Sequence, residues 1–138
     1  MKRVARFGVS LDKALLEKFD KYTKVKKYSN RSLAISDLIR ENLVKEEWTH
    51  GGEVAGAIAI VYDHHKRELV SRLMDIQHDY GHFIISAQHV HLDHHNCLEV
   101  VIVKGITEKV KELFESLRSC KGVKHGTLNM TTTGKEVR

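Results

Sequence analysis

The stretch HFIISAQHVHLDHHNCLEVVIVK, residues 82–104, indicates two strands joined by a tight turn. Apolar residues dominate segments 82–92 and 97–104, and the four residues between them, 93–96, are polar (DHHN). Polar turn residues between two runs of this length are typical of a β-hairpin. This hairpin is the centre from which the rest of the chain can be assigned.

One candidate strand and one candidate helix lie on each side of the hairpin. A strand is expected over 54–62 and a helix over 64–78 before it, and a helix over 107–118 and a strand over 123–131 after it. The order strand–helix–strand–strand–helix–strand predicts a ferredoxin-like domain and an α+β fold. The side chains expected to face its core from the two helices are Leu69, Leu73, Met74, Ile76, Val110, Leu113, Phe114 and Leu117.

The hairpin also carries a candidate metal site. His89 and His91 are two residues apart on a strand, so their imidazoles leave the same face. The short turn brings Cys97 back beside His91, and His78, at the end of the preceding helix, is the best candidate for a fourth ligand. His94 and His95 are expected to face solvent.

Two imidazoles and a thiolate suit late first-row divalent metals. A tetrahedral arrangement would favour zinc, whereas a planar one would favour nickel or copper(II). Because a thiolate tends to reduce copper(II), the planar case favours nickel. Spacing alone leaves the choice of metal open.

Charge divides the chain into two modules. Residues 1–48 hold 12 Lys and Arg against 7 Asp and Glu, a balance of +5, whereas residues 49–138 are balanced. All ten histidines lie in the second segment. A basic module followed by a histidine-rich one indicates attraction to a polyanion in the first and metal or proton binding in the second. With Gly51-Gly52 as the hinge, we expect domains over residues 1–50 and 51–138.

The first module has one candidate strand, residues 3–11, and two candidate helices. The first helix is expected to start near Asp12 and the second at residues 29–32 (SNRS), ending after Trp48. A lone strand has unpaired edges, which predicts a twofold dimer with an antiparallel two-stranded ribbon that fits the DNA major groove. The residues expected to point into the module are Phe7, Val9, Leu11, Leu15, Leu16, Phe19, Tyr22, Ile35, Leu38, Ile39 and Leu43.

The longest apolar run, residues 54–62, is far shorter than the roughly 18 residues that a membrane span needs. No charged-then-apolar leader opens the chain, and two cysteines give no disulfide framework. We therefore expect a soluble cytoplasmic protein without a membrane partner.

The first module resembles the ribbon-helix-helix repressors. Arg6, Gly8 and Ser10 match the strand that reads base edges, and the second helix starts with Ser29, Asn30 and Arg31, which would meet a phosphate. The whole chain is similar to the nickel-responsive transcriptional regulators. This similarity rests on Gln77-His78, His89-Val90-His91, Cys97-Leu98-Glu99 and residues 122–126 (GVKHG).

The resemblance implies an ACT-type ferredoxin-like domain and a homotetramer, a dimer of dimers. It implies one square-planar Ni²⁺ per subunit, held by His89, His91 and Cys97 of one chain and by His78 of a neighbour. It also implies repression of nickel-uptake genes through a double-stranded DNA operator, with Lys66 and Arg67 at the DNA backbone.

Two other functions are compatible with the sequence. The second module could sense an amino acid, as other ACT domains do, in a transcriptional regulator whose histidines are incidental. A metalloenzyme would need an open coordination position and a nearby base, for which Glu99 is the candidate. Because His78 completes the ligand set, no position is left vacant, and we expect no enzymatic activity.

Overall fold

The chain folds as two compact units, Met1–Ile39 and Arg40–Arg138, in the computed structural model, which describes residues 3–138. The boundary falls within helix α2, Arg31–His50, so this helix contributes its start to the first unit and its end to the second. Each unit is described by itself. The helices within residues 3–138 all fall short of the length or the apolar character needed to cross a bilayer.

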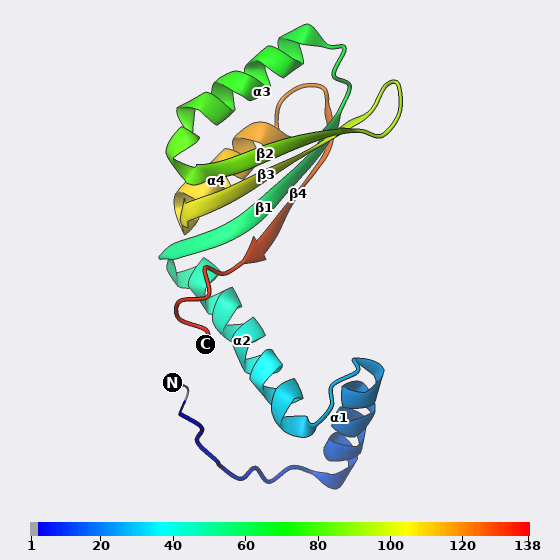
Figure 1. Cartoon of the computed structure of the whole chain (residues 1–138), viewed down its shortest axis with the longest axis vertical. Coiled ribbons are helices and arrows are strands. Elements are labelled where there is room, and N and C mark those ends of the chain that lie inside the picture. The colour runs from blue at the N-terminus through cyan, green and yellow to red at the C-terminus, as the bar shows by residue number, and fades with distance from the viewer. Residues whose placement is uncertain (1–2) are drawn as a thin grey trace. The chain divides into compact units, whose positions relative to one another are not determined.

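The first unit is built from helix α1, Lys13–Val25, and the start of α2 (Figure 1). Asp12 caps α1, as predicted, because its Oδ1 accepts hydrogen bonds from the backbone N–H groups of Ala14 (2.9 Å) and Leu15 (3.3 Å). Asn30 does the same for α2, where its Oδ1 accepts from the N–H of Leu33 at 2.9 Å. The polar capping residues in the sequence therefore predict both helix starts.

The strand predicted over residues 3–11 is not formed in the single chain. Segment 3–11 is exposed throughout and has no strand assignment, and Phe7 and Val9 keep 72% and 58% of their surface exposed. Leu15, Ile39 and Leu43, predicted to point inward, are also exposed. A strand needs the N–H and C=O groups of a neighbouring strand, and no part of the chain between residues 3 and 138 supplies them.

The second unit contains a four-stranded antiparallel sheet and two helices, which makes the fold α+β. The strands lie in the order β2-β3-β1-β4, and each neighbouring pair is antiparallel. Every strand and helix predicted for residues 51–138 is present in the predicted order. Their bounds are β1 Glu53–Tyr62, α3 Arg67–Asp79, the 3₁₀ turn η1 Gly81–Phe83, β2 Ile84–His91, β3 Cys97–Ile106, α4 Thr107–Arg118 and β4 Val123–Thr131.

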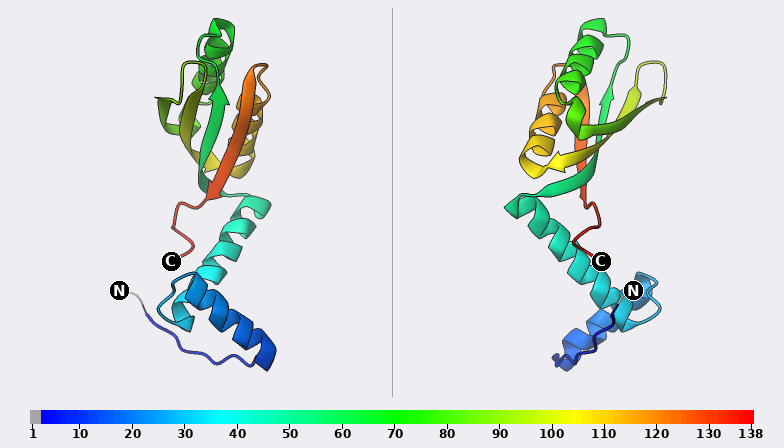
Figure 2. Two further views of the ribbon diagram at one scale, coloured as in Figure 1. Left: turned by 90° about the vertical axis from the view of Figure 1, so that its right-hand side faces the viewer. Right: turned by 60° about the vertical axis from the view of Figure 1, so that its left-hand side comes forward.

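Helices α3 and α4 lie on the same side of the sheet (Figure 2), which explains the alternating burial of its central strands. In β1, every second residue from Val54 to Tyr62 is buried, and the residues between them are half-buried. The predicted inward positions of both helices are confirmed except for Met74, which is 65% exposed. The core consists mainly of Val54, Ile58, Ile60, Leu69, Leu73, Val101, Val103, Val110, Leu113 and Leu117.

The end of α2 is fastened to the sheet by Trp48. Its buried ring donates a hydrogen bond from Nε1 to the carbonyl oxygen of Thr131 at 2.8 Å, and its own carbonyl accepts from Lys111 Nζ at 3.3 Å. Gly51 and Gly52 follow with φ of +86° and +114°, which glycine adopts without steric cost. These two glycines turn the chain from the helix into β1.

Helix α3 begins three residues later than predicted. The sequence suggested a start at His64, but His64 and His65 lie in a turn. Asp63 causes the delay, because its Oδ1 accepts the backbone N–H of His65 (2.9 Å) and its carbonyl accepts that of Lys66 (3.2 Å). The two histidines therefore belong to the β1–α3 loop, which matters for their chemistry.

Candidate metal centre

His89 and Cys97 lie close together near the turn of the hairpin. His89 is two residues before the end of β2, and Cys97 begins β3. Cys97 is the first residue of β3, its side chain faces the helix-covered side of the sheet, and only 1% of its surface is exposed. Its Sγ lies 3.9 Å from Nδ1 of His89. Two ligand atoms that sit about 2.0–2.3 Å from one ion lie no more than about 4.4 Å apart, so this pair is within reach of a single metal.

A buried carboxylate lies behind His89. Glu99, the Cα partner of His89 in the β2–β3 pairing, is 1% exposed. Its Oε1 accepts a hydrogen bond from the Tyr62 hydroxyl (2.7 Å), and its Oε2 accepts one from Gln77 Nε2 (2.8 Å). Burial, followed by the hydrogen bond to Glu99, raises the pKa of Tyr62 far above its ordinary value of 10.0, so the phenol stays protonated as a donor.

The same carboxylate orients the imidazole of His89. Nε2 of His89 lies 3.3 Å from Oε2 of Glu99, while Nδ1 faces Cys97. Nδ1 of His89 also lies 3.2 Å from the Tyr62 hydroxyl, so this nitrogen faces both that hydroxyl and the thiol. A ligand histidine held by a carboxylate through its other ring nitrogen is a common support of metal sites.

His91 lies close to this pair in the sheet without joining it in the single chain. It is the Cα partner of Cys97, so its side chain leaves the same face as predicted. Its imidazole is exposed and packs edge-on against His64, with 4.3 Å between ring centroids. A rotation of the His91 side chain is needed to bring a ring nitrogen to the thiol.

His78 lies in the last turn of α3 and is exposed. Together with His89 it lines a pocket of about 550 Å³ between α3 and the sheet, which Gln77, Glu99 and Tyr62 also line. The donor set on this side of the sheet, two strand imidazoles and a buried thiol with a helix imidazole at the pocket, fits a late first-row divalent ion.

A second group of possible ligands was not predicted. Asp63, His65 and His95 place one ligand atom each within 4.8 Å of one another, and this is the only such group of three found in the described residues. His95 is exposed, as expected, but its neighbours come from the β1–α3 loop. The sequence offered one signal, the two adjacent histidines after Asp63, and this signal was assigned to a helix.

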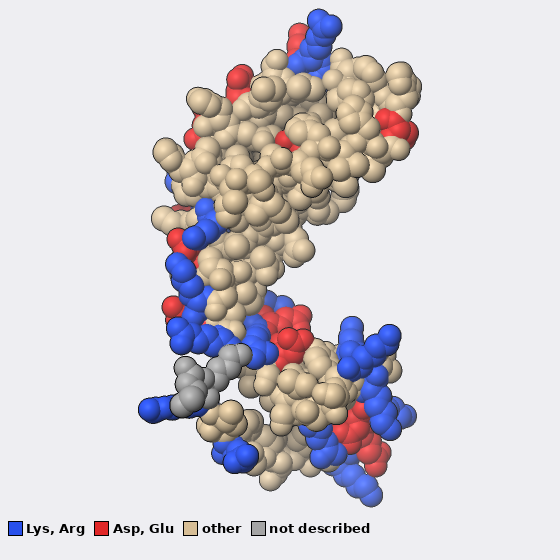
Figure 3. Space-filling view, in the orientation of Figure 1, with Lys and Arg blue, Asp and Glu red and all other residues tan. Residues whose placement is uncertain are grey.

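The predicted DNA-binding residues occupy exposed positions. Arg6, Gly8 and Ser10 lie in the unpaired segment, and a Cβ added at Gly8 would meet nothing within 4 Å. Ser29 and Asn30 precede α2, and Lys66 and Arg67 stand at the start of α3. Lysine and arginine side chains gather over α1 in Figure 3, whereas the visible face of the sheet is largely free of them.

Arg31 differs from the other predicted DNA-binding residues because it is already paired. Its Nε and Nη2 donate to the two carboxylate oxygens of Asp20, each at 2.8 Å. This bidentate ion pair joins the start of α2 to the middle of α1. The guanidinium therefore organises the first unit in the single chain.

The fold and these residues define a two-unit α+β protein with a histidine- and cysteine-rich candidate metal centre. Comparison with known proteins is consistent with this class. Residues 55–131 match the family model described as the NikR C terminal nickel binding domain. The chain belongs to the nickel-responsive regulator family.

Curated relatives match the chain over nearly its full length. Proteins of Chlorobium phaeobacteroides and Nitratidesulfovibrio vulgaris are each 55% identical to it, over 132 and 138 residues. A protein of Syntrophus aciditrophicus is 52% identical over 135 residues, and the alignment covers 98% of both chains. Each of the three carries the name "Putative nickel-responsive regulator".

Among solved structures, an uncharacterized protein from Thermotoga maritima aligns with 57% of this chain and 98% of its own, with a TM-score of 0.52. The two sequences are 11% identical over the aligned part. This similarity concerns the fold alone.

Proposed function

We propose that the chain is a nickel-dependent DNA-binding transcriptional repressor of nickel-uptake genes that acts in the cytoplasm. Residues 1–50 form a ribbon-helix-helix module, and residues 51–138 form a ferredoxin-like, ACT-type domain that holds one Ni²⁺ per subunit. The observation that carries the proposal is the pairing of the Cys97 thiol with His89 Nδ1 at 3.9 Å, supported by the buried Glu99. The names of the relatives favour a regulator over an enzyme.

Within this proposal, His89, His91 and Cys97 are the ligands from one chain. His89 is held by Glu99, Cys97 supplies a thiolate, and His91 turns away from His64 toward the thiol. The three residues sit at one end of the hairpin, so little loop entropy opposes their convergence. A bound nickel ion would supply strong directional bonds to imidazole and thiolate.

The fourth ligand, His78, would come from a neighbouring chain. It is exposed on α3 and therefore accessible to another subunit. The uncovered face of the sheet supports association, because Val90 and Ile102 there are 41% and 36% exposed and β1 presents a row of small side chains, Ala55, Ala57 and Ala59. A homotetramer, a dimer of dimers, would cover this face, and a separate interface on the helix-covered side would bring His78 of a neighbouring chain to each ligand set.

The ribbon-helix-helix assignment rests on the first unit. Its apolar residues at the unpaired segment remain exposed, and a second copy would both pair the segment and cover those residues. In that dimer Arg6, Gly8 and Ser10 would face base edges in the major groove, and Ser29, Asn30 and Arg31 would lie at the phosphates. Lys66 and Arg67 would add backbone contacts from the second domain.

Nickel and DNA would be coupled through the tetramer. His78 of one chain and the strand ligands of another, joined at one ion, restrict the arrangements that the subunits can take. Arrangements in which both ribbons meet successive half-sites would then be favoured, with a coupling of about 1–3 kcal/mol per linkage. DNA affinity should fall steeply with salt if several phosphates are contacted.

Electrophoretic mobility shift of operator DNA across a nickel titration tests the proposal. The wild-type protein should bind tightly only with nickel, and Cys97→Ser should lose this dependence. Cys120→Ser is the matched control, because Cys120 is the other buried cysteine and lies outside the ligand set. Equal DNA affinity of the wild-type protein with and without nickel would contradict the switch.

A further inference from the structure

Lys124 lies in the motif GVKHG, residues 122–126, which supports the family resemblance but has no part in the function proposed above. The glycines of this motif serve close packing. Gly122 has a φ of +105°, and a Cβ there would lie 2.9 Å from a side-chain carbon of Leu69 in α3. A Cβ at Gly126 would lie 3.1 Å from the nearest side-chain atom. Lys124 is exposed between them and has no such packing role.

The ammonium group of Lys124 reaches the turn of the β2–β3 hairpin, where Nζ donates a hydrogen bond to Oδ1 of Asn96 at 2.5 Å. Lys124 belongs to β4, which is separated from β3 by β1 in the sheet. The side chain can span this distance because Tyr62, the last residue of β1, is the Cα partner of both Cys97 and Val123. The start of β3, the end of β1 and the start of β4 therefore lie at the same end of the sheet.

Asn96 organises the turn, and it directly precedes the thiol of Cys97. Its carbonyl oxygen accepts the backbone N–H groups of Leu92 at 2.9 Å and of Asp93 at 3.3 Å. Its Nδ2 donates to both carboxylate oxygens of Asp93, each at 2.9 Å. With Nδ2 engaged by Asp93, Oδ1 is the remaining side-chain group of Asn96, and Lys124 occupies it. Lys124 thus ties the hydrogen bonds of the turn to β4.

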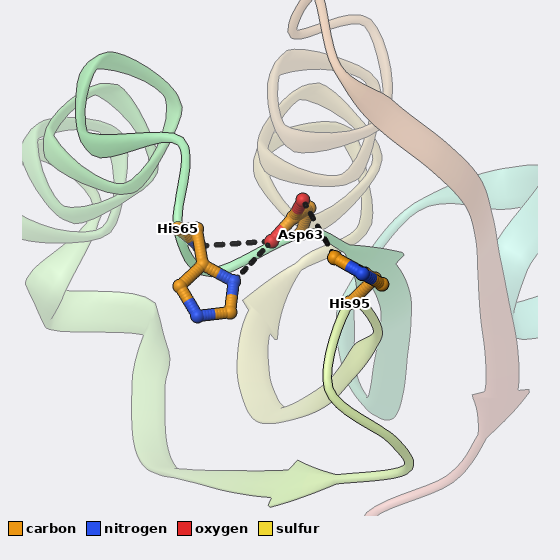
Figure 4. A group of neighbouring side chains, drawn as sticks. All are labelled: Asp63, His65 and His95. Carbon is orange, nitrogen blue, oxygen red and sulfur yellow. Dashed lines mark hydrogen bonds and ion pairs between the residues drawn. The ribbon is translucent and has the colours of Figure 1, made fainter.

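The imidazoles of the turn make looser contacts with the loop after β1. Nδ1 of His95 lies 4.0 Å from Oδ2 of Asp63 (Figure 4), and the His95 side chain is 70% exposed. The ring centroids of His94 and His65 are 4.9 Å apart. The hydrogen bond from Lys124 restrains the turn more closely than either of these contacts.

The position of the turn affects two of the proposed nickel ligands. His91 is the last residue of β2, Cys97 is the first residue of β3, and the two are Cα partners. They form the pair of the ladder nearest the turn, and the ends of elements are where local opening costs least. Because β2 is an edge strand with exposed side chains from Ile85 to His91, packing does little to hold this end of the hairpin. Displacement of the turn would move an imidazole and the thiol together.

We propose that Lys124 is a positioning residue of the metal centre, which holds the turn through Asn96 so that His91 and Cys97 stay in place for the ion. The proposal rests on the nickel site proposed above and gives Lys124 no contact with the ion. Ligands that are already in place lose less conformational freedom on binding, so they bind the ion more tightly. A lysine that served only as a solvated surface charge would leave the affinity for nickel unchanged.

Nickel affinity of the full-length protein, measured by competition with a chelator, tests the proposal. Lys124→Ala should weaken nickel binding about 3–10-fold, which corresponds to the net contribution of one hydrogen bond. Lys124→Arg keeps a long side chain with donors at its end and should restore the wild-type affinity. Lys104→Ala is the matched control, because Lys104 lies near the other end of β3, 3.9 Å from Glu53, and it should leave the affinity unchanged.

A double-mutant cycle with Asn96→Ala identifies the route by which Lys124 acts. If Lys124 acts through Asn96, its removal should cause no further loss of affinity when Asn96 is already alanine. The absorption band of thiolate-bound nickel should keep its position in Lys124→Ala, since the ligand set is unchanged. A shifted band would show that Lys124 alters the ligands themselves and would overturn the positioning role.

Three other results would also overturn the proposal: wild-type affinity in Lys124→Ala, an equal loss in Lys104→Ala, or a fully additive loss in the double variant. Absence of recovery in Lys124→Arg would do so as well. Failure of the nickel site itself gives a different result, because wild-type protein and Cys97→Ser would then bind nickel equally. In that case the role of Lys124 would fall together with the site.

Discussion

Arg31 and Asp20 form a two-point ion pair between α2 and α1, with Nε and Nη2 of the guanidinium each 2.8 Å from a carboxylate oxygen. The ion pair engages Arg31, a side chain that the sequence predicts to contact DNA. Both side chains are about half exposed, so the pair is accessible to a competing phosphate. Arg31 can therefore be released to a phosphate if the carboxylate gives way.

Asp20→Asn should accordingly increase DNA affinity. The substitution removes one negative charge and frees the guanidinium of Arg31 for a phosphate. If one more phosphate is neutralised, the slope of log affinity against log salt steepens by about 0.9. Salt-dependent binding of nonspecific duplex DNA measures this slope. Asp12→Asn is the control, because it removes the same charge at a helix cap away from Arg31, and equal slopes for both variants would contradict the role of Arg31.

The ion pair also predicts a pH dependence of Asp20. The hydrogen bond from Arg31 lowers the pKa of Asp20 below its ordinary value of 3.8. The folded state therefore favours the ionised form, and the stabilisation is present above pH 3.8 and is lost as the pH falls through the lowered pKa. NMR titration of the side-chain carboxyl carbon should show this pKa, and Arg31→Gln should return it toward 3.8. A pKa of 3.8 or more in the wild-type protein would refute the pairing.

The hydrogen bonds behind His89 predict that Tyr62 affects metal affinity without touching the metal. Tyr62→Phe removes the donor to Glu99 Oε1 and also removes the hydroxyl that lies 3.2 Å from His89 Nδ1. Loss of such a supporting contact typically weakens metal binding 10–100-fold. Nickel competition with a chelator measures the change, and Tyr80→Phe, which removes a hydroxyl outside the ligand set, should leave the affinity unchanged. A Tyr62→Phe protein with wild-type affinity would show that the Tyr62 hydroxyl, with its contacts to Glu99 and His89, does not position the ligand.

Cys120 is expected to be a structural thiol. It is buried and donates from Sγ to the carbonyl oxygen of Ser116, and burial raises its pKa above the ordinary value of 9.0. Above pH 9.0 the unfolded chain ionises at this residue before the folded chain does, so the contribution of Cys120 to stability is lost as the pH rises toward its folded pKa. Cys120→Ala should cost about 1 kcal/mol at pH 7, and the difference from wild type should shrink above pH 9.0. Urea unfolding at both pH values tests this, and a difference that grows with pH would contradict it.

The second unit could be predicted from sequence because its signals are local. The continuous apolar run over 54–62, the largely apolar segment 97–104 and the polar turn 93–96 define strands and a hairpin without reference to the rest of the chain. The predicted start of α3 was wrong because the Asp63 side chain holds a turn there. A carboxylate before two histidines also resembles a helix cap in the sequence. The group at Asp63 was missed because His95 reaches it from another loop, a contact that spacing does not encode.

The first unit shows a different limit of sequence reasoning. The pattern of residues 3–11 is that of a strand, but the chain forms none by itself, since hydrogen bonding in a strand depends on a partner. His91 shows the same limit at the candidate metal centre. Register places it beside Cys97, while its ring packs on His64 in the single chain. The proposed second chain would change the local structure at segment 3–11, and the proposed metal would change it at His91.

Val9→Asp tests whether a second copy covers the unpaired segment. Val9 is 58% exposed in the single chain, and in the proposed dimer it faces the helices together with Phe7 and Leu11. A twofold dimer would bury the new charge twice, and each buried charge costs several kcal/mol. The dissociation constant of the dimer, measured by analytical ultracentrifugation, should therefore increase at least about 100-fold, since each 1.4 kcal/mol changes it tenfold. Val25→Asp, which places the same charge at an exposed position of α1, should leave the dimer intact, and a Val9→Asp protein that associates as tightly as wild type would exclude the ribbon.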